Sequence, residues 1–275
     1  MKKTTALLAL IIALLGFTTI KTDGIRFRVE YKPGMRYNET IEQGTEATIT
    51  YIGSEEFLKN LKDKGVSNPT ITNKNLKMVE IMKTGKLIDS IQFPLNIEFV
   101  STTSNDGKQI IPDGTIIYGK ASLGGMPTLD SMFSPGMEDE TKKVFLKTMA
   151  STLSQISFPD KELNVGDTFV HETPLVIPIA GKKIEMKIAT IYKLTGVSGG
   201  LASFDIDQHY TMTLDEYTTD GSGSGSGHIV FDIAHNFYSS FDETGEMNLS
   251  MKTDDFSLKI SSKNSFKQSV VFGKN

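Results

Sequence analysis

Apolar and polar residues alternate along most of this chain, and no other feature of the sequence constrains its fold as strongly. Side chains of a β-strand point to opposite faces in turn, so a period of two predicts strands with one buried and one solvated face. Apolar residues at 247, 249 and 251 precede a polar turn, and apolar residues at 256, 258 and 260 follow it, which predicts a hairpin. Runs of the same kind cover residues 25–31, 47–51, 95–99, 184–188 and 204–212.

The C-terminal part, residues 228–272, predicts a meander of four antiparallel strands with a turn at residues 242–245. The run GSGSGSG at residues 221–227 precedes this meander and has two interpretations. As a low-complexity segment it predicts a flexible loop, which is the favoured interpretation. Alternating glycine also suits a flat strand whose bare face lies against a helix or an aromatic ring.

One central segment departs from the two-residue period and predicts a helix over about residues 135–157. Ser134 has the residue type of an N-cap, Pro135 suits the first helical position, and acidic residues follow in the first turn. A second, shorter helix is predicted at residues 54–64, capped by Ser54 and ended by Gly65. In the central helix, apolar residues recur at spacings of four, four and three, and so form one stripe: Phe145, Met149, Leu153 and Ile156.

These patterns predict a mainly β fold (α+β, with the helical part minor). We expect a curved antiparallel sheet, an incomplete β-barrel or a sandwich, packed on the one central amphipathic helix, with residues 21–275 forming a single β-rich domain. Such a sheet either packs solid or holds an apolar ligand. The chain has 12 methionines, whose flexible thioethers suit an adaptable apolar space. The helix stripe of Phe145, Met149, Leu153 and Ile156 is the candidate ligand-binding surface.

The first 20 residues, MKKTTALLALIIALLGFTTI, predict an export signal. Lys2 and Lys3 precede an apolar segment at residues 6–17, which is shorter than the about 20 residues of a membrane-spanning helix. A cleaved signal peptide is the main interpretation. An uncleaved anchor is the alternative, because no clean small-x-small cleavage site follows. We therefore expect export to the periplasm or cell envelope.

Composition excludes several classes of site. The chain has no cysteine, which excludes disulfides, zinc–thiolate sites, cysteine nucleophiles and a lipid anchor through an N-terminal cysteine. Its net charge is −4 and its basic residues form no cluster, which argues against a nucleic-acid partner. No G-x-S-x-G elbow lies between a strand and a helix, and GSGSGSG lacks the lysine of a phosphate loop. We therefore predict no catalytic residue and no cofactor.

The four histidines, at positions 171, 209, 228 and 235, match no metal-binding motif. Strand parity places His209 on a solvated face with Asp205 and Asp207, and His228 on a solvated face with Asp232. A hairpin around the Gly-Ser run would bring His209 near Asp232, which makes His209, His228 and Asp232 weak candidates for metal ligands. A solvated sheet face without metal is the favoured interpretation. His235 falls on the apolar face of its predicted strand, which predicts a buried core histidine.

The segment PDKELNVGDTF, residues 159–169, follows the central helix and leads into a strand. It resembles the corresponding segment of the DUF6263-type envelope proteins, found mainly in Bacteroidota. The Gly-x-Gly-x-Gly run, FD at 231–232 and ETG at 243–245 are similar to the same pattern, so the resemblance covers about residues 130–255. That family has no established activity, and the resemblance implies an envelope location only. The residues at 165–167 by themselves predict a tight turn in which Asp167 bonds nearby backbone amides.

The leading functional hypothesis is a non-enzymatic exported envelope protein that binds a lipid or other apolar small molecule, or another envelope protein. A structural or adhesive surface protein is the alternative. A metal-dependent hydrolase that uses the His/Asp sheet face is a less favoured one.

Overall fold

The computed structural model of the chain describes residues 24–153, 158–179, 182–213, 218–253 and 255–275. The predicted export signal, residues 1–20, lies outside these ranges. The elements are β1 (Ile25–Arg26), β2 (Met35–Gly53), α2 (Glu55–Asp63), β3 (Thr70–Thr84), β4 (Gln92–Ser104), β5 (Thr115–Ser122), β6 (Thr128–Phe133), α3 (Asp139–Leu153), β7 (Glu162–Leu163), β8 (Thr168–Ile179), β9 (Lys182–Ser198), β10 (Leu201–Thr213), β11 (Thr218–Asp232), β12 (Phe237–Lys252) and β13 (Phe256–Lys274).

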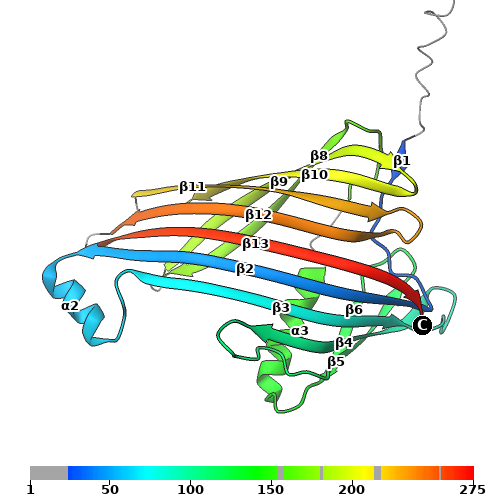
Figure 1. The fold of residues 1–275 in the computed structure, drawn as a ribbon, viewed down its shortest axis with the longest axis horizontal. Helices are drawn as coiled ribbons and strands as arrows, with labels where there is room; N and C mark the ends of the chain where they lie inside the picture. Colours follow the sequence, from blue (N-terminus) through cyan, green and yellow to red (C-terminus); the bar gives the residue numbers. More distant parts are fainter. Residues whose placement is uncertain (1–23, 154–157, 180–181, 214–217, 254) are drawn as a thin grey trace, which may run out of the picture.

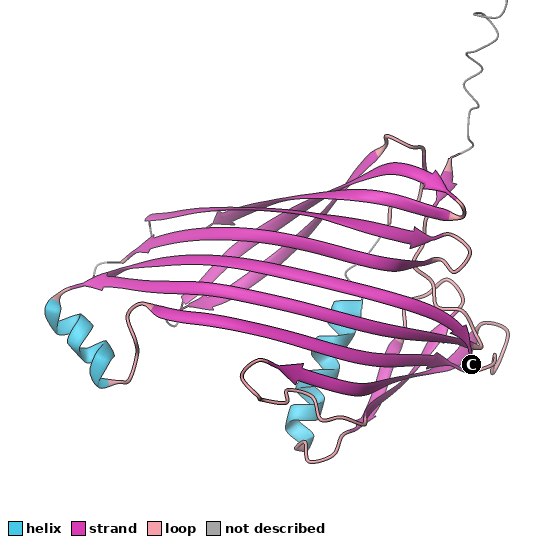
Figure 2. Ribbon diagram, in the orientation of Figure 1, coloured by secondary structure: helices cyan, strands magenta, loops and turns pink. Residues whose placement is uncertain are grey.

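Eleven of the described strands form one antiparallel sheet in the order β6-β5-β4-β3-β2-β13-β12-β11-β10-β9-β8, and β1 pairs with β7 separately. Figure 1 shows the long strands β2, β3, β12 and β13 across the front, with β8, β9 and α3 behind them. β6 and β8 are the two edges, so the sheet curves without closing on itself (Figure 2). The predicted mainly β fold, with a curved antiparallel sheet and a minor helical part, is confirmed.

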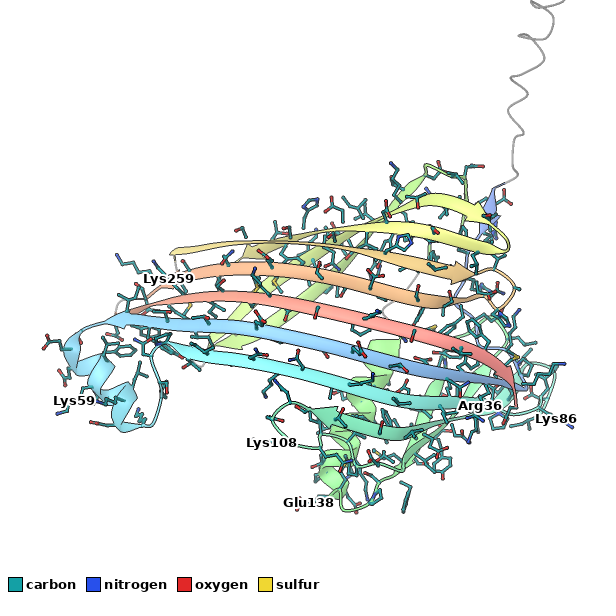
Figure 3. All side chains as sticks on the ribbon, in the orientation of Figure 1. Arg36, Lys59, Lys86, Lys108, Glu138 and Lys259 are labelled. Atoms are coloured by element: carbon teal, nitrogen blue, oxygen red, sulfur yellow. The ribbon has the colours of Figure 1, made fainter. Side chains whose placement is uncertain are left out.

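Exposed charged side chains lie on the sheet, on its loops and on helix α2, as the labelled Lys259, Lys108 and Lys59 illustrate in turn (Figure 3). The edge strand β8 contains Pro174 and Pro178, whose missing N–H groups are tolerated at an edge and make it a poor template for another strand.

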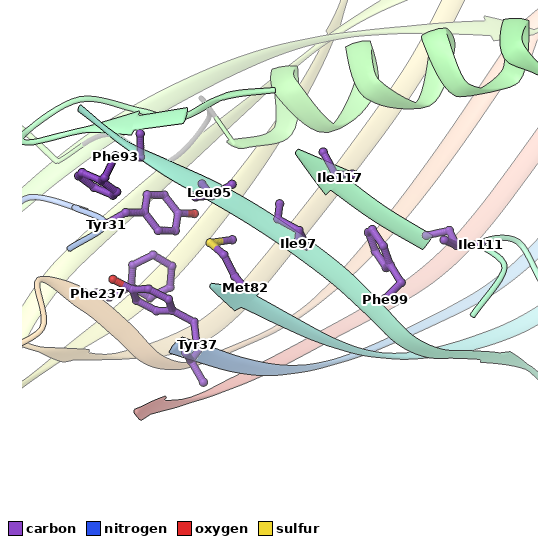
Figure 4. Packing of buried hydrophobic residues seen from close by; sticks show 12 residues of the cluster. Tyr31, Tyr37, Met82, Phe93, Leu95, Ile97, Phe99, Ile111, Ile117 and Phe237 are labelled. Carbon is purple, nitrogen blue, oxygen red and sulfur yellow. The ribbon is translucent and has the colours of Figure 1, made fainter. Parts of the chain in front are cut away.

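An aromatic cluster fills one end of the curved sheet. The N-terminal segment, residues 27–34, crosses this end, and Tyr31 packs edge-on against Tyr37 of β2, with ring centroids 5.6 Å apart. Phe237 of β12 joins both rings (Figure 4). Phe27, from the same segment, packs in a second cluster with Phe204 of β10 and Phe231 of β11.

The predicted strand at residues 25–31 is wrong beyond Arg26, because only Ile25 and Arg26 pair with another strand. The alternation of Phe27, Val29 and Tyr31 has a different origin. Phe27 enters the second aromatic cluster, Tyr31 enters the first, and Val29 packs against both. Burial of alternate side chains therefore gives the segment a period of two without a sheet ladder.

Both predicted helices form, but the central one begins later than expected. Gly136 adopts a φ of +72°, and the hydroxyl of Ser134 lies 2.7 Å from that of Thr115, so Ser134 is not the N-cap. α3 begins at Asp139, where the N–H of Lys142 donates to the carbonyl of Glu138. The predicted end at residue 157 lies outside the described residues. α2 has the predicted cap, because Ser54 Oγ accepts the N–H of Phe57 at 3.2 Å.

The predicted four-stranded meander at residues 228–272 is three long strands, β11, β12 and β13. Residues 242–245 lie in the middle of β12, paired on both sides, and the chain reverses at residues 233–236 instead. The predicted hairpin around residues 253–255 forms, with Met251 opposite Leu258. The favoured loop interpretation of GSGSGSG is wrong: residues 221–227 are part of β11, so the flat-strand alternative holds.

The turn before β8 forms as predicted. Asp167 Oδ2 accepts the backbone N–H of Asn164 at 2.8 Å, and Gly166 has a φ of +99°. This hydrogen bond holds the pKa of Asp167 below its usual value, and the contact is structural.

Candidate functional site: a cavity on the inner face of the sheet

The inner face of the sheet contains a cavity of about 350 Å³. Its walls come from the N-terminal segment, from β2, β3, β4, β12 and β13, from the connection between β5 and β6, and from α3. Most of the lining side chains are apolar, and four are methionines. The lining residues are Val29, Tyr31, Glu39, Ile41, Gln43, Leu76, Met78, Glu80, Met82, Ile97, Met126, Met149, Tyr238, Phe241, Glu243, Phe266 and Gln268.

Strand parity explains why these residues meet. Glu39, Ile41 and Gln43 follow the buried Tyr37 at every second position of β2, and so face the same side. On β3, Leu76, Met78, Glu80 and Met82 repeat the same spacing. Two larger hollows have volumes of about 670 and 590 Å³. The first shares Gln43, Leu76, Glu243 and Phe266 with the cavity, and the second is lined mainly by polar residues.

Two buried carboxyl groups face each other in the cavity. Glu39 of β2 lies directly opposite Glu80 of β3 in the strand register, and the two residues are 3% and 5% exposed. Gln268 Nε2 donates to Glu39 Oε2 at 2.7 Å. Glu80 Oε2 is buried and has no hydrogen-bond partner among the residues that the structure describes.

Burial dominates the protonation of this pair. It raises the pKa of Glu39 to about 7, against a smaller lowering effect of the Gln268 hydrogen bond. Burial also raises the pKa of Glu80 well above its usual value, and the charge of Glu39 raises it further. Ionising both carboxyl groups in one apolar site costs a large free energy, so the pair retains a proton near neutral pH.

A second polar group, Glu243 of β12, lies elsewhere on the cavity wall, at the level of Gln43 in the strand register. Gln208 of β10 donates to Glu243 Oε2 at 3.1 Å, and the hydroxyl of Tyr210 donates to Gln208 Oε1 at 3.0 Å. Burial raises the pKa of Glu243, with the Gln208 bond acting in the opposite direction. The cavity thus has apolar walls and a small number of convergent polar groups, the composition of a ligand-binding site.

The helix stripe predicted to bind a ligand enters the cavity at one point. Met149 lines the cavity, whereas Phe145 packs on Phe99 of β4 with ring centroids 6.0 Å apart. The side chain of Leu153 and the whole of Ile156 lie outside the described residues. Leu146, which the stripe did not include, packs against the same core cluster.

The strand register does not bring the weak metal candidates together. His209 pairs with Ser224, whereas Asp232 pairs with Leu201, so about eight residues of strand, or roughly 26 Å, separate His209 from Asp232. His228 Nδ1 lies 3.1 Å from Asp205 Oδ1, and His209 Nε2 lies 3.4 Å from Asp207 Oδ2. Within the described ranges, no three His, Asp or Glu side chains gather in a way that could hold a metal ion.

His235 is not the core histidine that its parity predicts. It lies in the turn between β11 and β12, half-buried, and its ring stacks on Phe272 at 4.2 Å. Its Nδ1 lies 2.9 Å from Asp232 Oδ2.

The residues that sequence reasoning missed are the acidic pair and its neighbours. Glu39 and Glu80 occupy the apolar parity of their strands, between Tyr37 and Ile41 and between Met78 and Met82. A carboxyl group on the apolar stripe of a strand was the available signal, because an unpaired buried acid is costly.

No protein-family model matches the chain, and no curated protein matches it. Among solved structures, the crystal structure of an outer membrane channel from Pseudomonas putida F1 shares 8% sequence identity with the chain. That match covers 91% of this chain and 100% of the channel, with a TM-score of 0.21, and it carries no argument about fold or function. None of the described helices is both long and apolar enough to span a membrane.

Proposed function

We propose that this chain is an exported, non-enzymatic protein of the cell envelope that binds an apolar small molecule, such as a lipid, in the inner cavity of its sheet. The observation that supports the proposal best is the cavity of about 350 Å³, with Met78, Met82, Met126 and Met149 among its lining residues. This volume lies in the range of small-molecule pockets. Flexible methionine side chains adapt to apolar shapes at modest affinity.

Export is proposed from the N-terminal sequence, in which Lys2 and Lys3 precede an apolar run. Kinship with the DUF6263-type envelope proteins remains a prediction and implies the same location. Binding of another envelope component is the second part of the hypothesis, and no described residue favours it over the cavity.

The proposal is tested on protein purified from an expressing bacterial envelope without detergent exchange. Organic extraction followed by mass spectrometry should release a lipid or similar apolar compound in stoichiometric amount. The extracted protein, refolded if needed, should then bind Nile red, a neutral apolar fluorophore, and release it when the extracted compound is added. Empty extracts together with no Nile red binding would contradict ligand binding and leave a structural or adhesive surface protein as the better hypothesis.

A further inference from the structure

The acidic pair in the cavity is unfavourable for folding. Glu39 and Glu80 are directly opposed on neighbouring strands, a position in which side chains lie about 5 Å apart and like charges destabilise the sheet. Among the lining residues that the structure describes, none is lysine, arginine or histidine, so no cation of the protein lies in the cavity with them. The fold itself therefore gives no reason for two acids at this place.

The hydrogen bonds of the pair are incomplete. Gln268 satisfies Glu39 Oε2, whereas Glu80 Oε2 is buried against the cavity with no partner among the described residues. A buried polar atom without a partner in a native protein calls for an explanation, and a bound group that supplies a donor is one.

We propose that the cavity selects amphiphiles whose polar head is a protonated primary amine, held between Glu39 and Glu80 with the apolar tail among the methionines. This inference rests on the proposed function and names its ligand class. An ammonium group supplies positive charge and three N–H donors, which suit the unpartnered Glu80 oxygen and an oxygen of Glu39. A hydroxyl head lacks the charge, and a carboxylate head meets two acids and no cation.

The protonation of the pair gives this proposal a pH signature. Near neutral pH the pair retains a proton, because burial raises the pKa of Glu39 to about 7 and that of Glu80 well above its usual value. Ammonium binding favours the ionised pair, so it releases the proton and strengthens as the pH rises.

The other titratable groups that face the pair do not reverse this direction. They are Tyr31 of the N-terminal segment, Tyr37 of β2 and Tyr238 of β12, and Glu243 of β12 lines the same cavity further along the strands. From β4, β13 and α3 the cavity lining includes the non-titratable Ile97, Gln268 and Met149. Burial raises the pKa of each tyrosine above its usual value, so all three stay neutral across the range of interest. Burial raises the pKa of Glu243 as well, so its ionisation also makes the cavity more negative as the pH rises. This change favours ammonium binding at higher pH.

The experiment measures how decylamine, decanol and decanoate displace Nile red from the purified chain, since the three competitors share one tail. At about pH 8 we expect decylamine to bind about tenfold more tightly than decanol, and decanoate to bind most weakly. Between about pH 6 and pH 8 the affinity for decylamine should rise, while that for decanol stays constant. Isothermal titration with decylamine gives the same affinities without the probe.

Glu80→Gln is the test variant, because it keeps the shape of the side chain and removes a buried acid that does not favour folding. It should abolish the preference for decylamine and leave decanol binding unchanged, and Glu39→Gln should behave in the same way. Glu42→Gln is the matched control on the outer face of β2, where Glu42 bonds Lys77, and it should retain the wild-type preference.

The outcomes separate the two proposals. If decanol and Nile red bind but decylamine binds no more tightly, or if Glu80→Gln keeps the preference, the amine proposal is wrong and the apolar cavity stands. If neither Nile red nor decylamine binds to the folded chain, both proposals are wrong.

Discussion

The phenol oxygen of Tyr210 lies over Gly245, two strands away, and a methyl group on Gly245 would collide with it. The side chain of Tyr210 extends across the glycines of β11 toward β12, and Gly223 lies directly beneath its ring. This contact explains the alternating glycines of residues 221–227: a bare strand face receives a large aromatic side chain.

This contact predicts that Tyr210→Phe restores part of the stability that Gly245→Ala loses. Gly245→Ala should lower the free energy of unfolding by about 1–3 kcal/mol, because the added methyl group overlaps the Tyr210 hydroxyl. Tyr210→Phe removes that oxygen, and the next atoms then lie 3.5 Å from the methyl position, an ordinary contact distance. Chemical denaturation of the two single variants and the double variant measures the coupling. Strictly additive effects would show that Tyr210 does not occupy this position.

Met149 tests whether α3 closes the inner face. It is half-buried on the helix and packs against the core cluster, so Met149→Asp should bury an unpaired charge and cost about 2–4 kcal/mol. Lys147, two residues earlier in the same helix, is exposed, and Lys147→Asp should be nearly neutral. Thermal unfolding compares the two, and equal shifts in Tm would contradict the packing of this helix face.

The fold was predictable where local spacing alone determines the structure. Residues 95–99 and 204–211 alternate because one face of each is more buried than the other, and both lie within strands. Residues 47–51 also lie within a strand, although all five are half-buried. Ser54 was recognisable as a cap for the same reason, since the N–H that it accepts is three residues away. Spacing failed at Ser134, whose hydroxyl bonds Thr115, a partner 19 residues earlier that no local pattern reveals.

The candidate site was harder to predict than the fold. Met149 was identified from helix periodicity, but Glu39 and Glu80 are 41 positions apart and become neighbours only through the register of β2 and β3. The sequence shows that each glutamate occupies an apolar position of its strand. It does not show that the two glutamates pair. The same dependence on register explains why His209 and Asp232 were wrongly expected to meet.

The acidic pair predicts a pH-dependent stability. The folded-state pKa of Glu39 is about 7, above the value of an exposed glutamate, so the folded chain binds more protons than the unfolded chain between about pH 4.5 and pH 7. The free energy of unfolding should therefore fall by roughly 2–3 kcal/mol across this window as the pH rises.

Denaturation at about pH 5 and about pH 7.5 measures this change. Glu39→Gln should reduce the loss of stability, and Glu42→Gln, an exposed change on the same strand, should leave it as in the wild type. A wild type whose stability rises over this range would contradict the buried pair.

The histidines predict a negative result with metal ions. His209 and His228 each lie beside a different aspartate, on strands whose register separates them, so we expect no stoichiometric zinc or manganese binding by isothermal titration. Tight binding that both His209→Ala and His228→Ala abolish would require a shared site and so a different register of β10 and β11.

The most direct test of the account is the affinity for Nile red of two tryptophan variants on β3. Leu76 lines the cavity, whereas Ile71 lies on the outer face of the same strand and is 74% exposed. Leu76→Trp should occupy part of the cavity and weaken Nile red binding by at least about tenfold, with a change in Tm of only a few degrees. Ile71→Trp should bind the probe as the wild type does. Equal affinities for the two variants, or no binding to the wild type, would contradict a ligand site on the inner face of the sheet.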